Sequence, residues 1–497
     1  MRITVRAGGA VGSIALSAAL VLWPRPAAGA QPRAPDTVAD AGGAARRFDS
    51  WSDGATLRLD YHHSGLGAEE TFALEALRRE GPWPGSRVHL VDPLNWGPYR
   101  FEVRDPATGR ILFARGYSSI FSEWVTTEEA KRSRRSFHES LRFPFPRRPV
   151  QVTVLRRGPD NLFREAATFP IDPASRLVRR EPVTSAGTVW SILENGPPET
   201  KVDLLILGDG YTASEMEAFH DDARRLASVL FATPPFDGLK RHFNVRAIDR
   251  PSEDSGVDRP SDGVFRRTVL NVTYDIFGSE RYALTLDNHT LREAAAQAPY
   301  EFIEILINDE KYGGGGIYNL FATCATRSAS TPYIFVHEFG HHFAALGDEY
   351  YTSSVAYDTS GPIVEPWEPN LTASLERASL KWKDLVSPDT PLPTPWDKEA
   401  YESFQAGIQR RRQELRARRA PEPEIDDLFR EELEWTRPFL ARQAYAGRVG
   451  AFEGAGYRAK GLYRGAADCV MFSRNRERFC PVCSRAIERV VDWVAGR

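Results

Sequence analysis

The stretch Thr331-Pro-Tyr-Ile-Phe-Val-His-Glu-Phe-Gly-His-His-Phe-Ala-Ala-Leu-Gly-Asp-Glu-Tyr350 decides how the chain is organised. Its apolar residues recur at intervals of three and four, which predicts a buried helix, and Pro332 suits the first turn of that helix. Because residues four apart share one face, His337 and His341 are placed to bind one metal ion, with the carboxylate of Glu338 beside it. Burial of these polar groups is costly unless a partner such as a metal satisfies them.

The third metal ligand has to come from outside the helical pair, because a catalytic zinc ion usually has three protein ligands and one position for water. Gly347 is placed to end the helix in a left-handed turn, which would return Asp348 to the metal. Asp348 is therefore the predicted third ligand, and Glu349 is the alternative. His342 points about 100° further around the helix, so we expect a packing or supporting role for it.

Glu338 is too close to both histidines along the helix to be a comfortable ligand, but it is well placed to act as a base. Zinc lowers the pKa of a bound water from about 15.7 towards 7, so that a carboxylate can take its proton at neutral pH. Glu338 would then pass this proton to the leaving amine of a cleaved peptide bond. The pattern predicts one catalytic Zn²⁺ ion and a protein or peptide substrate.

Composition and charge exclude some classes of partner. The 497 residues suffice for two or three domains, and 42% hydrophobic with 26% charged residues is typical of a globular protein. A formal net charge of −3 gives no reason to expect nucleic acid as a partner. No segment after the first thirty residues is apolar for the roughly 20 residues that a membrane helix needs. We therefore expect no integral membrane segment after signal removal.

Residues 1–30 have the pattern of a signal peptide. Arg2 and Arg6 precede an apolar run over residues 10–23, and Ala28-Gly-Ala30 fits a small-residue cleavage site. A secreted or periplasmic protein is expected, with residues 31–45 as a disordered leader rich in Ala, Gly and Pro.

The expected secreted or periplasmic location guides the interpretation of the cysteines. In an exported chain they are expected to form disulfides, although the sequence does not fix the pairing of Cys324, Cys469, Cys480 and Cys483. Cys480-Pro-Val-Cys483 has the form of half a zinc ribbon, but a second such pair is missing. Disulfides are therefore the preferred interpretation.

Residues 46–180 predict a β-sandwich-like domain, because short runs of alternating apolar and polar residues are separated by turn-forming residues. One helical piece is expected at residues 123–134. Histidines in this region show no convincing metal-ligand spacing, and we expect surface or packing roles for His62, His63, His89 and His138.

Residues 200–497 have a different pattern of apolar and polar residues, which predicts an α/β region. The continuous apolar runs at 202–208 and 302–307 are typical of strands buried on both faces. A capping box at Thr212–Glu215 predicts the start of a helix that lasts to residue 231, and a second box is expected at Thr290–Glu293. The fold class is therefore α+β.

Three other segments of this region have their own interpretation. Glycines 313–316 are either a plain connector or a segment that lets an extended substrate pair with a strand edge. Residues 398–437 are highly charged with few apolar positions, which predicts a helical pair inserted at the periphery. A closing helix is expected at residues 483–494.

Several motifs, in this order along the chain, resemble the bacterial IgA-specific metalloendopeptidase family, a secreted branch of the metzincin-like zinc peptidases. The motifs are Leu205–Tyr211, His337–Tyr350, Glu365–Asn370, Phe452–Tyr457, Gly461–Arg464 and Phe479–Cys483. The resemblance covers about 200–497, and the β-rich region resembles the domain that often precedes this catalytic unit. It implies a zincin/metzincin-like catalytic domain, whose zinc ligands and catalytic acid/base are His337, His341, Asp348 and Glu338.

The resemblance also implies that Met471 is the methionine turn beneath the metal. The spacing departs from the usual metzincin pattern, because Gly347 occupies the position of the third ligand and Asp348 follows one residue later. Ala344 replaces a glycine of that pattern. Three tyrosines are candidates for stabilising the oxyanion, and the sequence does not choose among Tyr350, Tyr351 and Tyr457.

Three functions are compatible with the sequence. The first is a secreted zinc endopeptidase, and the second is a non-catalytic surface or glycan-binding protein with a structural zinc site. The third is a gluzincin-type enzyme in which a downstream glutamate such as Glu365 replaces Asp348. Glu338 favours an enzyme, because a purely structural site needs no base beside the water.

Overall fold

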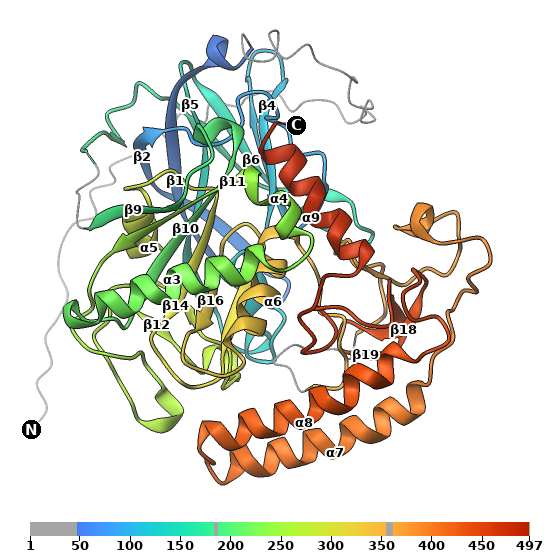
Figure 1. Cartoon of the computed structure of the whole chain (residues 1–497). Helices are drawn as coiled ribbons and strands as arrows, with labels where there is room; N and C mark the ends of the chain where they lie inside the picture. The colour runs from blue at the N-terminus through green and yellow to red at the C-terminus, as the bar shows by residue number, and fades with distance from the viewer. Residues whose placement is uncertain (1–46, 183–186, 354–360, 497) are drawn as a thin grey trace, which may run out of the picture. The chain divides into compact units, whose positions relative to one another are not determined.

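The computed structural model describes residues 47–182, 187–353 and 361–496, which form a mixed α+β structure (Figure 1). The predicted signal peptide and leader lie outside the described residues. Among the helices that are described, none combines the length and apolar character needed to cross a bilayer.

Two four-stranded sheets form the first part of the described chain. One has the order β5-β1-β2-β8 and the other the order β4-β3-β6-β7. Their bounds are β1 (Ser52–Leu66), β2 (Glu69–Pro82), β3 (Tyr99–Arg104), β4 (Ile111–Tyr117), β5 (Arg135–Pro146), β6 (Val150–Arg157), β7 (Phe163–Ile171) and β8 (Val178–Arg179). Buried apolar side chains of both sheets share one core, among them Leu59 on β1 and Val152 on β6. Alternating residues of the two sheets therefore enclose a single apolar layer.

The helix predicted at residues 123–134 is wrong in extent. The structure has a short helix α2 (Ile120–Trp124) and a separate 3-10 turn at Glu129–Lys131. Between them the hydroxyls of Thr126 and Thr127 donate to backbone carbonyls of the preceding turn, at 2.7 and 2.8 Å. Side-chain bonds of this kind compete with the helical ladder, which explains the break.

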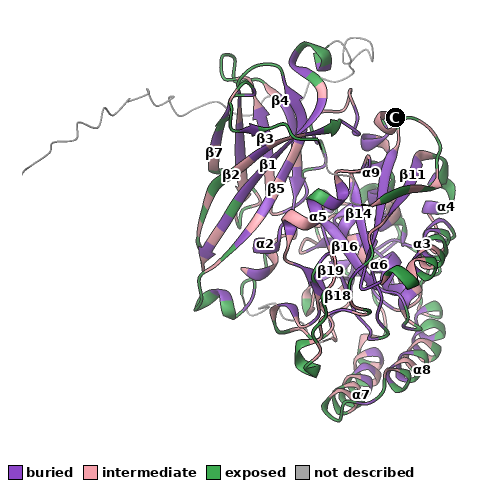
Figure 2. Cartoon of the chain, turned by 90° about the vertical axis from the view of Figure 1, so that its left-hand side faces the viewer, coloured by how far each residue is buried: buried purple, intermediate pink, exposed green. Residues whose placement is uncertain are grey.

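A six-stranded sheet, in the order β15-β16-β14-β10-β11-β9, is the centre of the remaining structure. The bounds are β9 (Thr188–Leu193), β10 (Val202–Asp209), β11 (Phe243–Asp249), β14 (Phe302–Ile307), β15 (Gly314–Ile317) and β16 (Phe321–Ala325). The four inner strands are parallel, while the edge strands β9 and β15 run antiparallel to their neighbours. Every residue of β10 and β14 is buried, as predicted (Figure 2).

Successive side chains of β10 enter two different cores. Leu204 and Ile206 belong to a core that also contains residues of the helices α3 (Met216–Phe231), α6 (Thr331–Ala344) and α9 (Pro481–Val494). Leu205 and Leu207 belong to a second core, which contains residues of α5 (Asn288–Ala295). The sheet is therefore covered on both faces, and α3 and α6 lie on the same one (Figure 1).

The two predicted capping boxes have different outcomes. Thr212 and Glu215 form the expected box, followed by a 3-10 turn and then α3. The second prediction is wrong, because α5 begins after Asp287, whose carboxylate accepts a bond from the backbone N–H of Thr290. Asp287 is an equally good cap three residues earlier, and it leaves Thr290 inside the first turn.

The charged segment forms the predicted helical pair, α7 (Lys398–Ala417) and α8 (Glu422–Ala441), whose outer faces are exposed (Figure 2). It is not merely peripheral, however. Ile425, Phe429 and Leu440 of α8 belong to the same core as α6, and the Phe429 ring centroid lies 5.0 Å from that of Tyr312.

A further sheet of three short strands has the order β17-β19-β18. The strands are β17 (Leu371–Thr372), β18 (Phe452–Ala455) and β19 (Arg458–Arg464).

Candidate active site

The helix α6 presents the two histidines of the motif and ends earlier than the sequence suggests. It stops at Ala344, and Ala345 takes the left-handed conformation, with φ 55°. The prediction that Gly347 makes this turn is wrong, because Gly347 does not have a positive φ. A Cβ on Gly347 would lie 2.6 Å from Leu371 Cδ1, so close packing explains the glycine.

Three electron-pair donors meet beside α6. His337 Nε2 lies 3.1 Å from His341 Nε2, and Asp348 Oδ1 lies 2.9 and 3.2 Å from these two nitrogens. A tetrahedral zinc site with ligands at about 2.0–2.1 Å has edges of about 3.3 Å between neighbouring donors. The three residues therefore have the chemistry and the spacing of a metal site.

The backbone sets the tautomer of both histidines. Nδ1 of His337 lies 3.0 Å from the carbonyl oxygen of Val470, and Nδ1 of His341 bonds to the carbonyl of Leu346. A carbonyl only accepts, so each Nδ1 carries a proton, and in the neutral form of each ring Nε2 has the lone pair that a metal would bind. A backbone carbonyl behind each imidazole is the usual support of a metal-binding histidine.

Electrostatics favour a cation at this cluster. Burial alone would raise the pKa of Asp348, but His341 and His337 hold the pKa of this carboxyl well below its usual range. Burial alone would lower the pKa of His341, and the Asp348 carboxylate instead raises it to about 9. The buried carboxylate thus strongly stabilises positive charge beside it.

Asp348 and Glu349 point to different surroundings. The Tyr457 hydroxyl donates to Asp348 Oδ2, which leaves Oδ1 facing the histidines. Glu349 is held elsewhere, because its N–H donates to the carbonyl of Met471 and its carboxylate accepts from Asn370 Nδ2 at 3.0 Å. Of the two alternatives, only Asp348 is brought to the histidine pair.

The other acidic alternative, Glu365, is engaged away from the cluster. Its carboxylate accepts from the hydroxyl of Thr372 at 2.9 Å and from the N–H of Ala373 at 2.8 Å, and it pairs with Lys381 at 3.0 Å.

His342 is buried and contacts the backbone, in agreement with the expected packing or supporting role. Its Nδ1 lies 2.9 Å from the carbonyl of Ile317, and its Nε2 faces the N–H of Ile303.

Glu338 lines a cleft of about 720 Å³ together with His337, His341 and Asp348. Behind it, on β14, Glu304 is fully buried and neither of its carboxylate oxygens has a hydrogen-bond partner among the described residues. Burial and the charge of Glu338 raise the pKa of Glu304 well above its usual value. Sequence reasoning missed Glu304, whose only signal is an acid inside an apolar run.

Met471 is fully buried and packs against α6. A Cβ on Gly340 would lie 3.0 Å from its sulfur, so this glycine of the motif lets Met471 approach the helix closely. The neighbouring Val470 supplies the carbonyl that orients His337. The segment predicted to form the methionine turn therefore contacts the histidine helix.

The three candidate tyrosines do not all lie in the same place. Tyr350 and Tyr457 line the cleft, and the ring of Tyr350 stacks near His337 at 6.1 Å between centroids. Tyr351 packs instead towards Tyr401, at 6.2 Å. Sequence reasoning missed Arg281, which also lines the cleft and donates to the Tyr350 hydroxyl at 3.3 Å; it comes from a loop without a recognisable motif.

The glycine run 313–316 is not a plain connector, because residues 314–317 form the edge strand β15 beside α6. A Cβ on Gly316 would lie 2.2 Å from the carbonyl oxygen of Glu338. Gly314 and Gly316 line the cleft, as do Arg156 and Asn161 of the β6–β7 region. Asn161 Nδ2 donates to the carbonyl of Glu365, another residue of the cleft, at 2.7 Å.

The cysteines differ from the disulfide prediction, since all four thiols are free and buried. Cys469 Sγ and Cys483 Sγ are 3.7 Å apart, far beyond the bond length of about 2.05 Å. Cys480 lies in the same cluster. Cys324 is elsewhere, on β16.

The histidines of the first two sheets are distributed as expected, with one addition. His63 is buried and bonds Glu139 and Glu70, and His89 bonds the carbonyl of Trp493. His138 stacks on His289, which pairs with Glu75 at 2.8 Å. These last three side chains lie close together on the surface.

Comparison with known proteins gives the chain a family. Residues 190–491 match the family model described as IgA Peptidase M64, and residues 47–168 match the model described as Peptidase M64 N-terminus. No curated protein matches the chain. Since the larger match alone covers more than half of the 497 residues, and since it confirms the resemblance seen in the sequence, the chain belongs to the M64 family of IgA peptidases.

Proposed function

We propose that the protein is a secreted zinc-dependent endopeptidase that hydrolyses peptide bonds in proteins. Membership of a peptidase family supports hydrolysis of peptide bonds and implies a metal ion. The observation that carries the zinc-dependent mechanism is the cluster of His337 Nε2, His341 Nε2 and Asp348 Oδ1, with Glu338 beside it in a cleft. These residues fit zinc, because two imidazoles and one carboxylate leave a position for water.

In this proposal α6 is the active-site helix of a metzincin-like catalytic domain that spans residues 200–497. Residues 46–180 form a β-sandwich-like domain in front of it, with residues 398–437 as an insertion. Support comes from the covered parallel sheet, from the approach of Met471 to α6 at Gly340, and from the two family matches. In this proposal Met471 would lie beneath the bound metal.

The chain's own residues have distinct roles in this mechanism. His337, His341 and Asp348 would hold the zinc ion, which when bound would acidify water and polarise the substrate carbonyl. Glu338 takes the proton of the attacking water and delivers it to the leaving amine. The Tyr350 hydroxyl accepts from Arg281, so its own proton can be donated to the carbonyl oxygen of the substrate as charge develops there.

The edge strand β15 suits an extended peptide substrate. It forms the outer edge of the central sheet and lines the cleft beside α6. Gly314 already exchanges backbone hydrogen bonds with Arg281 and Ala283, so a substrate would pair with the part of β15 that follows it. Peptides commonly bind such edges by adding a strand through main-chain hydrogen bonds. The glycines keep this edge free of bulky side chains next to Glu338.

The deciding experiment compares Glu338→Gln with the wild type. We expect the variant to keep its zinc and to lose nearly all hydrolysis of a mixed protein substrate, while a chelator abolishes hydrolysis by the wild type. Glu310→Gln is the control, because Glu310 is an exposed acid that does not line the cleft. Full activity of Glu338→Gln would refute the mechanism, and zinc binding without any cleavage by the wild type would favour a non-catalytic surface or glycan-binding protein.

The third ligand and the export signal have their own tests. Asp348→Ala should lose the zinc of this site, whereas Glu365→Ala should retain it; the reverse result would identify a gluzincin-type site.

The proposal that the protein is secreted rests on the pattern of residues 1–30. N-terminal sequencing of exported protein should find a start near Gln31, and an intact Met1 would contradict the signal peptide.

A further inference from the structure

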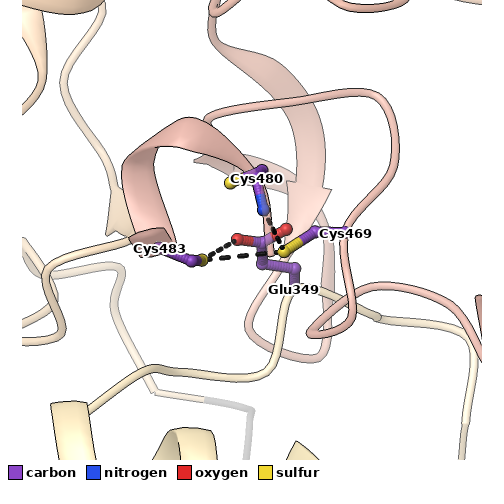
Figure 3. A group of neighbouring side chains, drawn as sticks. All are labelled: Glu349, Cys469, Cys480 and Cys483. Carbon is purple, nitrogen blue, oxygen red and sulfur yellow. Dashed lines mark hydrogen bonds between the residues drawn. The ribbon is translucent and has the colours of Figure 1, made fainter. Parts of the chain in front are cut away.

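A second group of side chains that could hold a metal ion includes Glu349, the residue after Asp348. Its members come from three stretches of chain, and their ligand atoms all lie within 4.8 Å of one another (Figure 3). They are Glu349, Cys469, Cys480 and Cys483, all of them buried. None of them belongs to the His337, His341 and Asp348 cluster.

The spacing of these atoms is that of a tetrahedral zinc site. With Zn–S bonds of about 2.3 Å, two thiolates on one zinc ion are about 3.8 Å apart, and a thiolate and a carboxylate oxygen are about 3.6 Å apart. Cys469 Sγ and Cys483 Sγ are separated by 3.7 Å, and Cys483 Sγ lies 3.2 Å from Glu349 Oε1. Cys480 and Cys483 also have the C-x-x-C spacing that recurs in structural zinc sites.

The carboxylate of Glu349 has an unmet demand for a positive partner. Its Oε2 atom is buried and has no hydrogen-bond partner among the described residues, while Oε1 accepts from Asn370 and faces Cys483. A buried carboxylate is costly unless it is paired or binds a metal. The charge of buried Arg464 acts on Glu349 only from beyond ion-pair distance. A divalent cation in the cluster would bind the carboxylate directly.

Neighbouring groups hold the ligands in the way that second-layer contacts support a metal site. The N–H of Cys480 points at the sulfur of Cys469, 3.2 Å away (Figure 3). The side chain of Asn370 donates to the Glu349 carboxylate at 3.0 Å. Such bonds orient thiolates and carboxylates before a metal binds. With four protein ligands the group leaves no position for water, which is the arrangement of structural rather than catalytic zinc.

We propose that Glu349, Cys469, Cys480 and Cys483 bind a second, structural zinc ion. This inference is independent of the proposed peptidase mechanism, because it uses none of its residues. The ion joins three stretches that surround the candidate active site: the residue after Asp348, the segment that leads into Met471, and the first turn of α9. Its role is to fix these stretches to one another.

The test starts from the double variant His337→Ala/His341→Ala of the full chain, which removes two ligands of the candidate catalytic zinc. Native mass spectrometry and metal analysis of protein purified without chelator should still find one zinc ion per chain. Replacing that zinc by cobalt should give the near-ultraviolet charge-transfer band of a thiolate–cobalt bond. Adding Cys469→Ser or Cys480→Ser should remove both the ion and the band.

Cys324→Ser is the matched control, because Cys324 is equally buried but bonds only backbone carbonyls of its own region. It should leave zinc content and the cobalt band unchanged. If the serine variants do not fold, the cobalt band of the double variant alone decides. Its absence, or an intact mass under non-reducing conditions that is lower by two hydrogens, would overturn the proposal. Loss of hydrolysis in Glu338→Gln bears only on the catalytic site, so the two proposals fail separately.

Discussion

Tyr457 and Tyr350 lie on the same cleft but have different hydrogen-bond partners. The Tyr457 hydroxyl donates to Asp348 Oδ2, while the Tyr350 hydroxyl accepts from Arg281. In the proposed mechanism, loss of the first hydrogen bond should weaken zinc binding, and loss of the second should weaken stabilisation of the oxyanion.

We therefore expect Tyr457→Phe to lower zinc affinity by about 10–100-fold, as loss of a supporting contact to a ligand typically does. Tyr350→Phe should keep that affinity and lower kcat by about 10²–10³-fold. Competition with a chromogenic chelator measures the first effect, and peptide cleavage at saturating zinc measures the second. Tyr351→Phe, on a residue that packs towards Tyr401, is the control for both. Equal behaviour of Tyr350→Phe and Tyr457→Phe would contradict this division of roles.

Glu304 gives a residue-scale prediction about pH. Burial and then Glu338 raise the pKa of Glu304 above its ordinary value of 4.5, so the folded chain binds this proton more tightly than the unfolded chain. The stability that this proton supplies is fully present below pH 4.5 and is lost as the pH rises towards the folded-state pKa. Replacement by Gln removes this titration.

The difference in unfolding free energy between Glu304→Gln and the wild type should therefore increase in favour of the variant as the pH rises from about 4.5. Urea unfolding at a series of pH values measures it. Glu310→Gln is the control, since Glu310 is an exposed acid close by in the sequence. A difference that does not vary with pH would show that Glu304 is not buried as described.

The contact between β15 and α6 leads to a prediction at the scale of elements. A Cβ on Gly316 would meet the backbone oxygen of Glu338 at 2.2 Å, and backbone cannot move aside without shifting the helix. Gly316→Ala should destabilise the fold by about 1–3 kcal/mol and lower kcat, because overpacking displaces α6 and the two histidines that it carries.

Gly407→Ala is the matched control for that change. Gly407 lies inside α7, and a Cβ there has nothing within 4 Å. This alanine should stabilise the helix by up to about 1 kcal/mol and leave hydrolysis unchanged. Thermal unfolding and peptide cleavage on both variants make the comparison, and equal melting temperatures would count against close packing at Gly316.

Sequence reasoning succeeded at this scale where one local pattern dominates. The apolar runs at 202–208 and 302–307 predicted strands covered on both faces, and the periodicity of 331–344 predicted α6. It failed where local signals competed, as at Asp287 and Thr290, or where a residue takes an unfavourable conformation, as Ala345 does. Tertiary contacts of 340–347 hold that turn, and a pattern of residue types does not encode them.

The candidate site was predictable in part for the same reason. His337, Glu338 and His341 are spaced by the helix itself, so their meeting follows from the sequence. Arg281, Glu304 and the cysteine cluster gather through contacts between distant segments, which a single sequence does not reveal. The disulfide prediction failed because it rested on the expected compartment and not on the positions of the sulfur atoms.

Across the whole molecule, Arg142 connects the first pair of sheets to the central one. From β5 its guanidinium bonds Glu80 at 3.1 Å, donates to the carbonyl of Tyr300 and lies 3.7 Å from the centroid of the Tyr300 ring. Glu80 is buried and also pairs with Arg58. Removal of Arg142 therefore weakens a buried charge network and a contact between two parts of the fold.

Arg142→Met should lower the unfolding free energy by about 3 kcal/mol, the scale for breaking a buried ion pair. Arg148→Met, on an exposed residue next to the same strand, should change it by less than about 0.5 kcal/mol. Urea unfolding followed by tryptophan fluorescence measures both. Equal midpoints for the two variants would show that Arg142 does not hold the two parts together.

Asp348 and Glu349 are consecutive residues whose carboxylates face two separate clusters. One short piece of backbone thus takes part in both, and a cation at either cluster restrains the same peptide units. By thermodynamic reciprocity, whatever the first ion contributes to the affinity of the second, the second returns to the first by the same factor. Occupancy of the buried thiolate cluster would then change the affinity of the cleft for its own metal. An oxidant that reacts with the sulfurs would therefore lower the catalytic rate without modifying a catalytic residue.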